Sequence, residues 1–167
     1  MQIDGLITKA ARQHGIPSKR LKAIVEVESA GDPWAVRYEP NFRWLWNIAE
    51  DEPWKGDTQD DSVPAPAGAS EPTERRCQAM SFGLVQIMGA TARELGFDGP
   101  FLTQLCDPEL NLEYGCKYLK RLYRRFGGEY GWEGIAAAYN AGSPRKTDDG
   151  SWENQDYVDK VTEAGGL

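Results

Sequence analysis

The sequence is poor in the residues that bind metals and form cross-links. It holds one histidine, His14, and three cysteines, Cys77, Cys106 and Cys116, in 167 residues. A zinc site or a histidine-based catalytic triad would have to be built almost without imidazole, so we expect no metal and no cofactor, and we place His14 on a helix surface. No C-x-x-C pair occurs, and an odd cysteine count leaves at least one thiol outside any disulfide scheme. This cysteine usage predicts synthesis in a reducing compartment.

Long apolar runs are missing as well. No stretch approaches the roughly 18 consecutive apolar residues that a membrane span requires. Residues 1–15 form an amphipathic pattern where a signal peptide has a continuous apolar stretch. We therefore expect no membrane span and no signal peptide. The length suits one domain with a real core and is short for two, so we predict a single domain over residues 1–167, and a monomer.

The negative charge of the chain is concentrated in one segment. Residues 51–74 carry seven acidic side chains against Lys55 alone, and so hold six of the seven net negative charges. The segment is also rich in Pro, Ala, Gly and Ser, which is typical of a loop that cannot bury enough apolar surface to fold by itself. We interpret residues from about 50 to 76 as a loop inserted into a nearly neutral domain.

A basic cluster lies near the end of the longest predicted helix, at Lys117, Lys120, Arg121, Arg124 and Arg125. Such a cluster can bind nucleic acid or an anionic wall polymer. An apolar stripe opposite already explains the helix as a core element, so we interpret the basic residues as a solvated face. Because the net charge is also acidic, we expect no nucleic-acid partner.

Helical periodicity dominates, and no strand-like alternation of any length occurs. The predicted fold class is therefore mainly α. Glycines at 15 and 127 are expected to end helices, and Asp107 is expected to cap the longest one. The predicted helices cover residues 2–14, 17–30, 42–49, 89–95, 107–126, 132–139 and 153–164.

The stretch VEVES places two glutamates two positions apart in the second helix. On a wheel of about 100° per residue, Glu28 falls in the middle of the apolar face formed with Leu21 and Ile24. Glu26 points to solvent one turn after Lys22, and an i,i+4 ion pair explains it sufficiently. Loss of hydration raises the pKa of a carboxyl group, which suits Glu28 to act as a general acid. A structural carboxylate at the helix end is the alternative.

Two further stretches carry groups that can contact a ligand. In SFGLVQIM, Gly83 lets backbone approach a partner, Gln86 offers an amide, and Met88 provides a soft apolar wall. In IAAAYNAG, Tyr139 can orient a carboxyl group and Asn140 can bind an N-acetyl group or a sugar hydroxyl. Taken alone, the first stretch is better explained by core packing.

In chain order, E-S, S-x-G-L-V-Q-I-M and A-Y-N-A-G resemble the catalytic domain of the soluble lytic transglycosylase family, a branch of the lysozyme superfamily. The likeness extends over nearly the whole chain. It implies a mainly α, lysozyme-like α+β fold in which one helical domain holds a long substrate groove. Val85 stands where the family usually has methionine. The interval of about fifty residues between Ser29 and Ser81 is longer than in many members and looks like insertions of phage-associated members.

The resemblance also implies roles for individual residues. Glu28 matches the family's single catalytic acid/base and is followed by Ser29. Tyr139 matches the tyrosine that holds this carboxyl group, and Asn140 matches a neighbour that contacts substrate. In the second motif, the implied groove residues and the turn that supports them are Gln86, Met88, Ser81 and Gly83.

The implied reaction is cleavage of the β-1,4 bond between N-acetylmuramic acid and N-acetylglucosamine in peptidoglycan glycan strands, with formation of a 1,6-anhydromuramoyl end. Two alternatives stay open. A goose-type lysozyme-like hydrolase would need Glu39 or Asp32 to position a water, although pairing of Glu39 with Arg37 or Arg43 is the simpler account. A glycan-binding or phage tail module without turnover is the second alternative.

The biological setting is the least constrained expectation. No export signal is expected and the cysteine usage is that of a reducing compartment, which is typical of a phage or prophage enzyme made in the host cytoplasm. Such an endolysin reaches the wall through a holin or is carried in the virion. A domain excised from a larger chain explains the same features.

Overall fold

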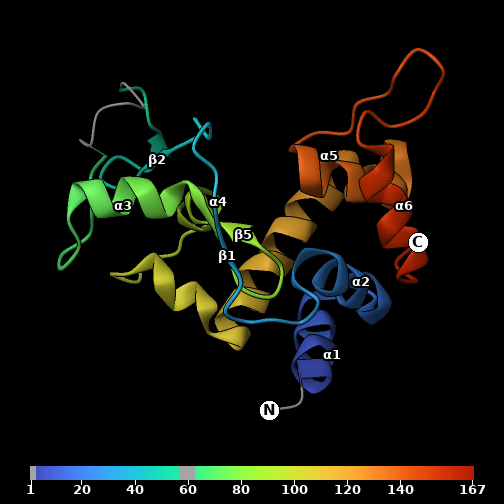
Figure 1. Cartoon of the computed structure of the whole chain (residues 1–167), viewed down its shortest axis with the longest axis horizontal. Coiled ribbons are helices and arrows are strands. Elements are labelled where there is room, and N and C mark those ends of the chain that lie inside the picture. The colour runs from blue at the N-terminus through green and yellow to red at the C-terminus, as the bar shows by residue number, and fades with distance from the viewer. Residues whose placement is uncertain (1–2, 57–62) are drawn as a thin grey trace. The chain divides into compact units, whose positions relative to one another are not determined.

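The computed structural model describes residues 3–56 and 63–167, and the chain divides into two compact units. Unit 1 consists of Met1–Gly31 and Gly115–Leu167, and unit 2 of Asp32–Tyr114. Figure 1 follows the chain from its blue N-terminal helices to its red C-terminal helix, all in unit 1. In the described ranges, no helix is long and apolar enough to cross a membrane. The predicted single domain includes both units and stays a prediction, as does the monomer.

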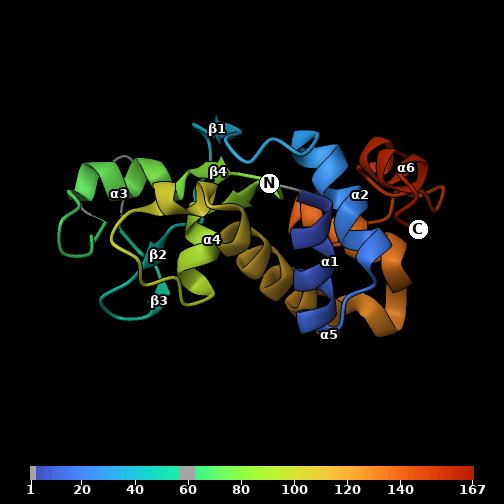
Figure 2. The ribbon, with the colours of Figure 1, turned by 90° about the horizontal axis from the view of Figure 1, so that it is seen from below.

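Two helices open unit 1. The first, α1 (Ile3–His14), buries Ile7 and Ala11 and ends at Gly15, which takes the left-handed conformation with a φ of 68°. The second, α2 (Ser18–Ser29), packs against α1, and Figures 1 and 2 show the two side by side. Both predicted helices are confirmed.

The longest helix starts in unit 2 and continues into unit 1. It is α5 (Pro108–Ala141), capped by Asp107, whose Oδ1 accepts a hydrogen bond from the Leu110 N–H at 2.9 Å. The predicted stop at Gly127 is wrong, because this residue keeps the helical conformation. The helix is instead interrupted at Gly131, whose φ of 60° and ψ of −159° suit glycine almost alone.

The last helix completes unit 1. It is α6 (Gln155–Glu163), which packs on α2 and buries Val158 and Val161. Leu119 and Ile135, from the two parts of α5, are also buried in unit 1. The packing of α6 on α2 brings the last part of the sequence to the helix that carries Glu28.

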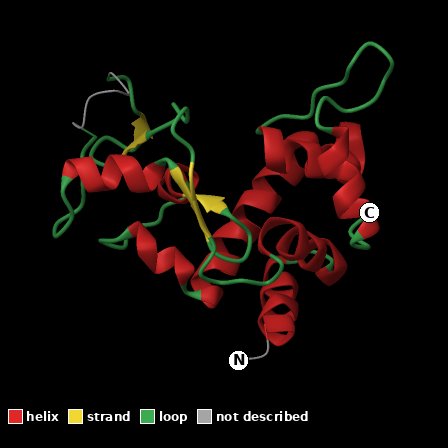
Figure 3. Cartoon of the chain, in the orientation of Figure 1, coloured by secondary structure: helices red, strands yellow, loops and turns green. Residues whose placement is uncertain are grey.

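The strands all lie in unit 2 and are drawn yellow in Figure 3. An antiparallel sheet has the order β1 (Val36–Tyr38), β4 (Met80–Phe82), β5 (Ile87–Met88). A second sheet pairs β2 (Trp46–Asn47) with β3 (Glu52–Pro53). Strands of two or three residues are too short to leave an alternating pattern in the sequence, which is why none was predicted.

The helices of unit 2 are α3 (Glu71–Gln78), α4 (Gly89–Glu94) and a 3-10 helix, η1 (Leu102–Cys106). The helix predicted over residues 89–95 is confirmed as α4. At the start of α3, Ser70 caps the helix by accepting a hydrogen bond from the Thr73 N–H at 3.3 Å. The mainly α fold class with few strands is thus confirmed.

A buried ion pair joins α3 to α4. Arg93 and Glu74 are 3% and 2% exposed, and the guanidinium binds both carboxylate oxygens at 2.7 and 2.9 Å. The Nη1 group of Arg93 donates hydrogen bonds to the carbonyls of Phe97 and Gly99. This fork-to-fork geometry satisfies both charges inside the unit.

Two predictions about unit 2 are wrong. The segment 42–49 forms no helix and contains β2, because the buried side chain of Gln78 binds both backbone groups of Trp46, at 2.7 and 3.0 Å. The acidic segment 51–74 is not loop to its end, since α3 begins at Glu71 and Glu74 belongs to the core. Residues 57–62 lie outside the described residues.

The three cysteines form no disulfide. Cys106 and Cys116 are buried, and Cys77 is partly buried. Burial raises the pKa of the Cys77 and Cys106 thiols, which lowers their reactivity. The prediction that at least one cysteine stays outside a disulfide is confirmed.

Candidate active site

Glu28 lies on the last turn of α2. The helix buries Leu21, Ile24 and Val25 of its apolar face. Glu28 is partly buried and Glu26 is exposed, as the helical wheel predicted. Lys22 was predicted to pair with Glu26, but its Nζ lies 2.9 Å from Oδ1 of Asp4 on α1. Asp4 is also the main cause that raises the pKa of Lys22, and the charge of Glu26 contributes least.

A tyrosine of α6 binds Glu28 directly. The hydroxyl of Tyr157 donates a hydrogen bond to Oε1 of Glu28 at 2.6 Å, a length typical of a bond to a charged acceptor. Burial raises the pKa of Tyr157 far above its ordinary value, and the negative charge of Glu28 raises it further. The hydroxyl therefore stays protonated at neutral pH and fixes the orientation of the carboxylate.

Tyr139, on the second part of α5, is influenced by the charge of the same carboxyl group. Its ring is 8% exposed and packs on Tyr118 with centroids 5.2 Å apart. Burial, and then the charge of Glu28, raises the pKa of Tyr139 well above its ordinary value. The charge of Glu28 therefore acts on Tyr139 within unit 1. The predicted role of Tyr139 in holding the carboxyl stays a prediction.

The two other predicted residues of unit 1 have local partners. Ser29 is partly buried, and its Oγ donates to the carbonyl of Val25 at 3.2 Å along the helix. Asn140 is exposed, and its Oδ1 accepts a hydrogen bond from Asn154 at 2.9 Å. Asn154 also donates to the carbonyl of Ala137 at 3.0 Å, so it ties the end of α5 to the segment before α6.

In unit 2, Ser81, Gly83 and Gln86 form one hydrogen-bonded turn between β4 and β5. Nε2 of Gln86 donates to the carbonyls of Ala35 and Gly83 at 2.9 and 3.0 Å. Oε1 of Gln86 accepts from the Ser81 hydroxyl at 2.8 Å. Both amide hydrogens of Gln86 are thus engaged in shaping the turn. Its predicted contact with glycan stays a prediction.

Gly83 is required at this turn for two reasons. Its φ is 67°, in the left-handed region, and a Cβ there would lie 2.5 Å from Nδ2 of Asn111 and 2.9 Å from the carbonyl oxygen of Leu105. Asn111 is fully buried and donates to the carbonyls of Phe82 and Leu105 at 2.7 and 2.8 Å. Its Oδ1 accepts from the Val85 N–H at 2.9 Å. Asn111 therefore stabilises the turn between β4 and β5 through three hydrogen bonds to its neighbouring backbone.

Met88 and Glu39 complete the predicted set. Met88 is partly buried and pairs with Ser81 in the register of β4 and β5, so the two side chains lie on one face of the sheet. Oε1 of Glu39 lies 2.5 Å from Nε of Arg37. The simpler account of Glu39, an ion pair with Arg37, is confirmed.

Two tryptophans of unit 2 are unusually exposed. Trp34 and Trp44 are 74% and 81% exposed. The backbone N–H of Trp34 donates to Oδ1 of Asp32 at 2.9 Å, and the next carbonyl, that of Ala35, is bound by both Gly83 and Gln86. The position of the Trp34 backbone is therefore fixed by the same turn that contains Gln86.

Two residues of the site were missed from sequence. Tyr157 has Val161 one turn later on the buried side of α6, and a tyrosine on an apolar face is a signal that its hydroxyl has a buried partner. Asn111 lies about 20° from Leu122 on a helical wheel, at the border of the apolar stripe. An amide in that place signals a buried hydrogen-bonding role.

A comparison with protein families gives one match over most of the chain. The model of the family described as Transglycosylase SLT domain matches residues 5–160. The matched range includes Glu28, Tyr139 and Tyr157 in unit 1, and the turn from Ser81 to Gln86 in unit 2.

Proposed function

Because the chain belongs to the transglycosylase SLT domain family of peptidoglycan-degrading lytic transglycosylases, we propose that it cleaves the β-1,4 bond between N-acetylmuramic acid and N-acetylglucosamine. Glu28 is the single acid/base in this proposal. The observation that carries it is the 2.6 Å hydrogen bond from Tyr157 to Glu28, whose charge also acts on Tyr139. A single carboxyl group held in one orientation by a phenol can serve as the acid and then as the base.

The first step needs a proton. Glu28 in its protonated form donates to the glycosidic oxygen, so the bond from C1 of the muramic acid residue to that oxygen breaks and the leaving sugar departs as an alcohol. Positive charge develops at C1 and its ring oxygen. The N-acetyl carbonyl oxygen of the same sugar supports this charge. Glu28 is partly buried at the end of α2, and the Tyr157 hydroxyl engages only its Oε1.

The second step uses the same carboxyl group in reverse. Glu28, now ionised, accepts the proton of the C6 hydroxyl as the C6 oxygen bonds to C1, which gives a 1,6-anhydromuramoyl end and restores the acid. An internal nucleophile has a large effective concentration, so water competes poorly. The matched motifs contain one carboxylate, which suits this route better than a two-carboxylate hydrolysis.

A goose-type hydrolase remains the second candidate, since its chemistry differs only in the nucleophile. It needs a carboxylate that positions water. The two carboxylates considered for this task, Glu39 and Asp32, already bind Arg37 and the N–H of Trp34. These contacts favour the transglycosylase reaction.

The substrate-binding part of the proposal rests on unit 2. Gln86, Met88 and the exposed ring of Trp34 lie on or next to one turn, and an exposed indole can stack on the C–H face of a sugar. Ser29 and Asn140 are assigned to substrate contacts in unit 1. A phage or prophage origin is also part of the proposal, and it is supported by the cysteine usage and by the long interval between Ser29 and Ser81.

A Glu28→Gln variant tests the catalytic assignment. Replacement of the acid by an amide of the same shape is expected to lower the rate of glycan cleavage on purified peptidoglycan by about 10²- to 10⁴-fold. Glu26→Gln, on the exposed side of α2, is the matched control and is expected to keep the parent rate. Equal wall clearing by Glu28→Gln and the parent would overturn the enzymatic proposal and favour a binding module.

The chemical outcome is decided by mass spectrometry of the released muropeptides. The transglycosylase reaction gives products lighter by one water than those of hydrolysis, and these products cannot be reduced by borohydride. Reducing ends of full mass would assign the enzyme to the hydrolases. Glu28 would keep its role in either case.

A further inference from the structure

Unit 1 contains a cavity that is separate from the residues assigned to catalysis. It has a volume of about 300 Å³ and lies between the segment that joins α1 to α2 and one face of α5. His14 and Pro17 line one side, and Leu119 lines the other. Neither Glu28 nor Tyr139 is among its lining residues.

Two cations of α5 face this cavity without a counter-charge. Lys120 and Arg124, one helical turn apart, both line it, and none of the lining residues is acidic. Within residues 3–56 and 63–167, neither side chain forms a hydrogen bond or an ion pair. Other bases of the same helix are engaged, as Arg121 lies over the ring of Tyr118 at 5.1 Å. The basic cluster is thus not uniformly a solvated face.

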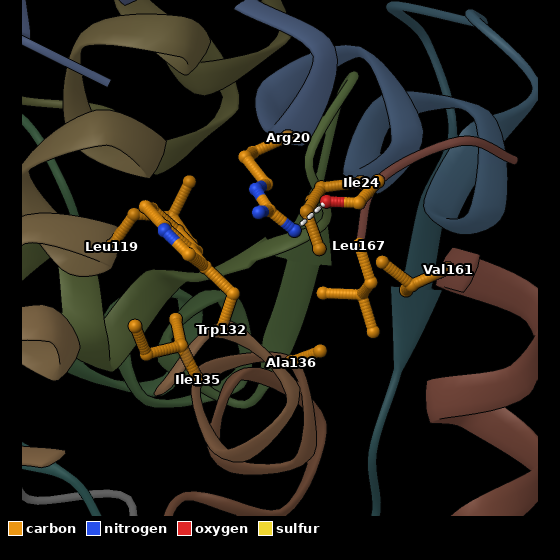
Figure 4. Close-up of a pocket in the computed structure, with 9 residues that line it drawn as sticks. Arg20, Ile24, Leu119, Trp132, Ile135, Ala136, Val161 and Leu167 are labelled. Atoms are coloured by element: carbon orange, nitrogen blue, oxygen red, sulfur yellow. Dashed lines mark hydrogen bonds between the residues drawn. The ribbon is translucent and has the colours of Figure 1, made fainter. Parts of the chain in front are cut away.

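An aromatic wall stands beside these cations. The rings of Tyr123 and Trp132 lie 5.4 Å apart at an angle of 40°, and both line the cavity. Figure 4 draws another pocket, which shares Leu119 and Trp132 with this cavity, and shows Arg20 next to the indole of Trp132. The Arg20 guanidinium lies 5.0 Å from the ring centroid and also donates to the carbonyl of Gly166. The indole is therefore fixed before any ligand arrives.

We propose that this cavity binds one sugar ring that carries an anionic group, either a carboxylate or a phosphate. The volume lies at the lower end of the range for ligand pockets, roughly 300 to 1,000 Å³, so it fits a monosaccharide unit. The aromatic rings contact the C–H face of the sugar, and Lys120 and Arg124 bind the anion.

The identification of a source for this ligand rests on the proposed function, whereas the binding site itself does not. Peptidoglycan carries a carboxylate on its muramic acid residues, and phosphate-bearing wall polymers carry the other anion. Binding of either one would hold the enzyme on the wall at a point other than the scissile bond.

The test is an NMR titration of the Trp132 indole N–H in the Glu28→Gln protein, so that turnover does not enter the measurement. The probes are N-acetylmuramic acid, N-acetylglucosamine 6-phosphate and neutral N-acetylglucosamine. We expect a saturable shift with at least one anionic sugar and at least tenfold weaker binding of the neutral sugar. Binding of the carboxylate probe alone identifies muramic acid as the source, and binding of the phosphate probe alone identifies a phosphate polymer.

Variants define the site. Lys120→Gln combined with Arg124→Gln is expected to weaken binding of the anionic sugar at least tenfold, and Arg125→Gln, an exposed base that does not line the cavity, is expected to leave it unchanged. Absence of a saturable shift, equal binding of the neutral sugar, or full affinity in the double variant would each overturn the proposal. An active Glu28→Gln enzyme would instead overturn the catalytic assignment and leave these binding results standing.

Discussion

Glu28 and Tyr157 are 129 residues apart in the sequence, and their side chains meet at 2.6 Å. The contact exists because α6 packs on α2 and carries Tyr157 on the side that faces the end of α2. A carboxyl group with one fixed donor can present its other oxygen to a substrate in a single orientation. The orientation of the Glu28 carboxyl group therefore depends on the Tyr157 hydroxyl, which lies outside the three sequence motifs.

Tyr157→Phe tests this dependence. Loss of a hydrogen bond to a charged group costs about 1.5 to 3 kcal/mol, so we expect kcat on glycan strands to fall about tenfold or more while KM changes little. Steady-state kinetics and the pH profile of kcat measure the effect. If kcat is unchanged and a higher KM accounts for the whole loss of kcat/KM, Tyr157 contributes to substrate binding and does not position Glu28.

Glu74 makes a second residue-scale prediction, on stability. Glu74→Gln leaves the buried Arg93 guanidinium without its counter-charge, so we expect the free energy of unfolding to fall by about 3 to 5 kcal/mol. Glu71→Gln, exposed on the first turn of the same helix, is the matched control and should change it by less than about 0.5 kcal/mol. Urea denaturation of both variants gives the comparison. Equal midpoints would mean that the pair contributes nothing net.

At the scale of elements, the turn between β4 and β5 is the most tightly specified feature of unit 2. Gly83 sits in the left-handed region against Asn111 and Leu105, and Gln86, with a φ of 47°, takes the same region. Such strain persists only where surrounding contacts over-determine it. The hydrogen bonds of Asn111 and of the Gln86 side chain provide those contacts.

Gly83→Ala separates crowding from backbone strain. A Cβ at this position meets backbone at 2.9 Å and Asn111 at 2.5 Å, so we expect a loss of roughly 3 kcal/mol or more in the free energy of unfolding. Gly96→Ala is the control, because its φ is also positive, at 87°, but nothing lies within 4 Å of the added atom. That variant should lose only about 1 kcal/mol. Chemical denaturation measures the free energy of unfolding of both variants. A similar loss in both would show that the neighbours of residue 83 move aside for the added Cβ.

At the scale of the whole molecule, burial of two tyrosines beside Glu28 links stability to alkaline pH. The pKa of Tyr139 and of Tyr157 is raised in the folded chain, first by burial and then by the charge of Glu28. The unfolded chain releases these protons near pH 10, and the folded chain retains them. Their contribution to stability is therefore complete below about pH 10 and is lost as the pH rises above it.

Tyr157→Phe should consequently flatten the alkaline limb of the stability curve. Between pH 9 and pH 11 we expect the variant to lose roughly 1 kcal/mol less of its free energy of unfolding than the parent. Urea titrations at each pH measure it, with Tyr38→Phe, a ring 45% exposed, as the comparison. Parallel curves for the parent and Tyr157→Phe would contradict the raised pKa.

Much of the helical part of the molecule could be predicted from periodicity and caps, because α1, α2, α4 and the start of α5 carry their own signals, such as Asp107 and Gly15. The segments that failed depend on distant partners. Trp46 is held as a strand by Gln78, Glu74 is drawn into the core by Arg93, and the break in α5 lies at Gly131, while Gly127 stays helical. Secondary-structure propensity depends on neighbouring residues in the sequence and therefore cannot predict contacts between distant residues.

The sequence by itself determined the mainly α character and the partly buried position of Glu28, because both follow from local spacing. It also carried the family, through the resemblance of its three motifs. Tertiary structure alone decided which phenol binds Glu28, which amide supports Gly83 and which cations line the cavity beside Trp132. The physical reason is that a hydrogen bond or an ion pair is fixed by the distance between side chains, and helix packing brings together residues that lie far apart along the chain.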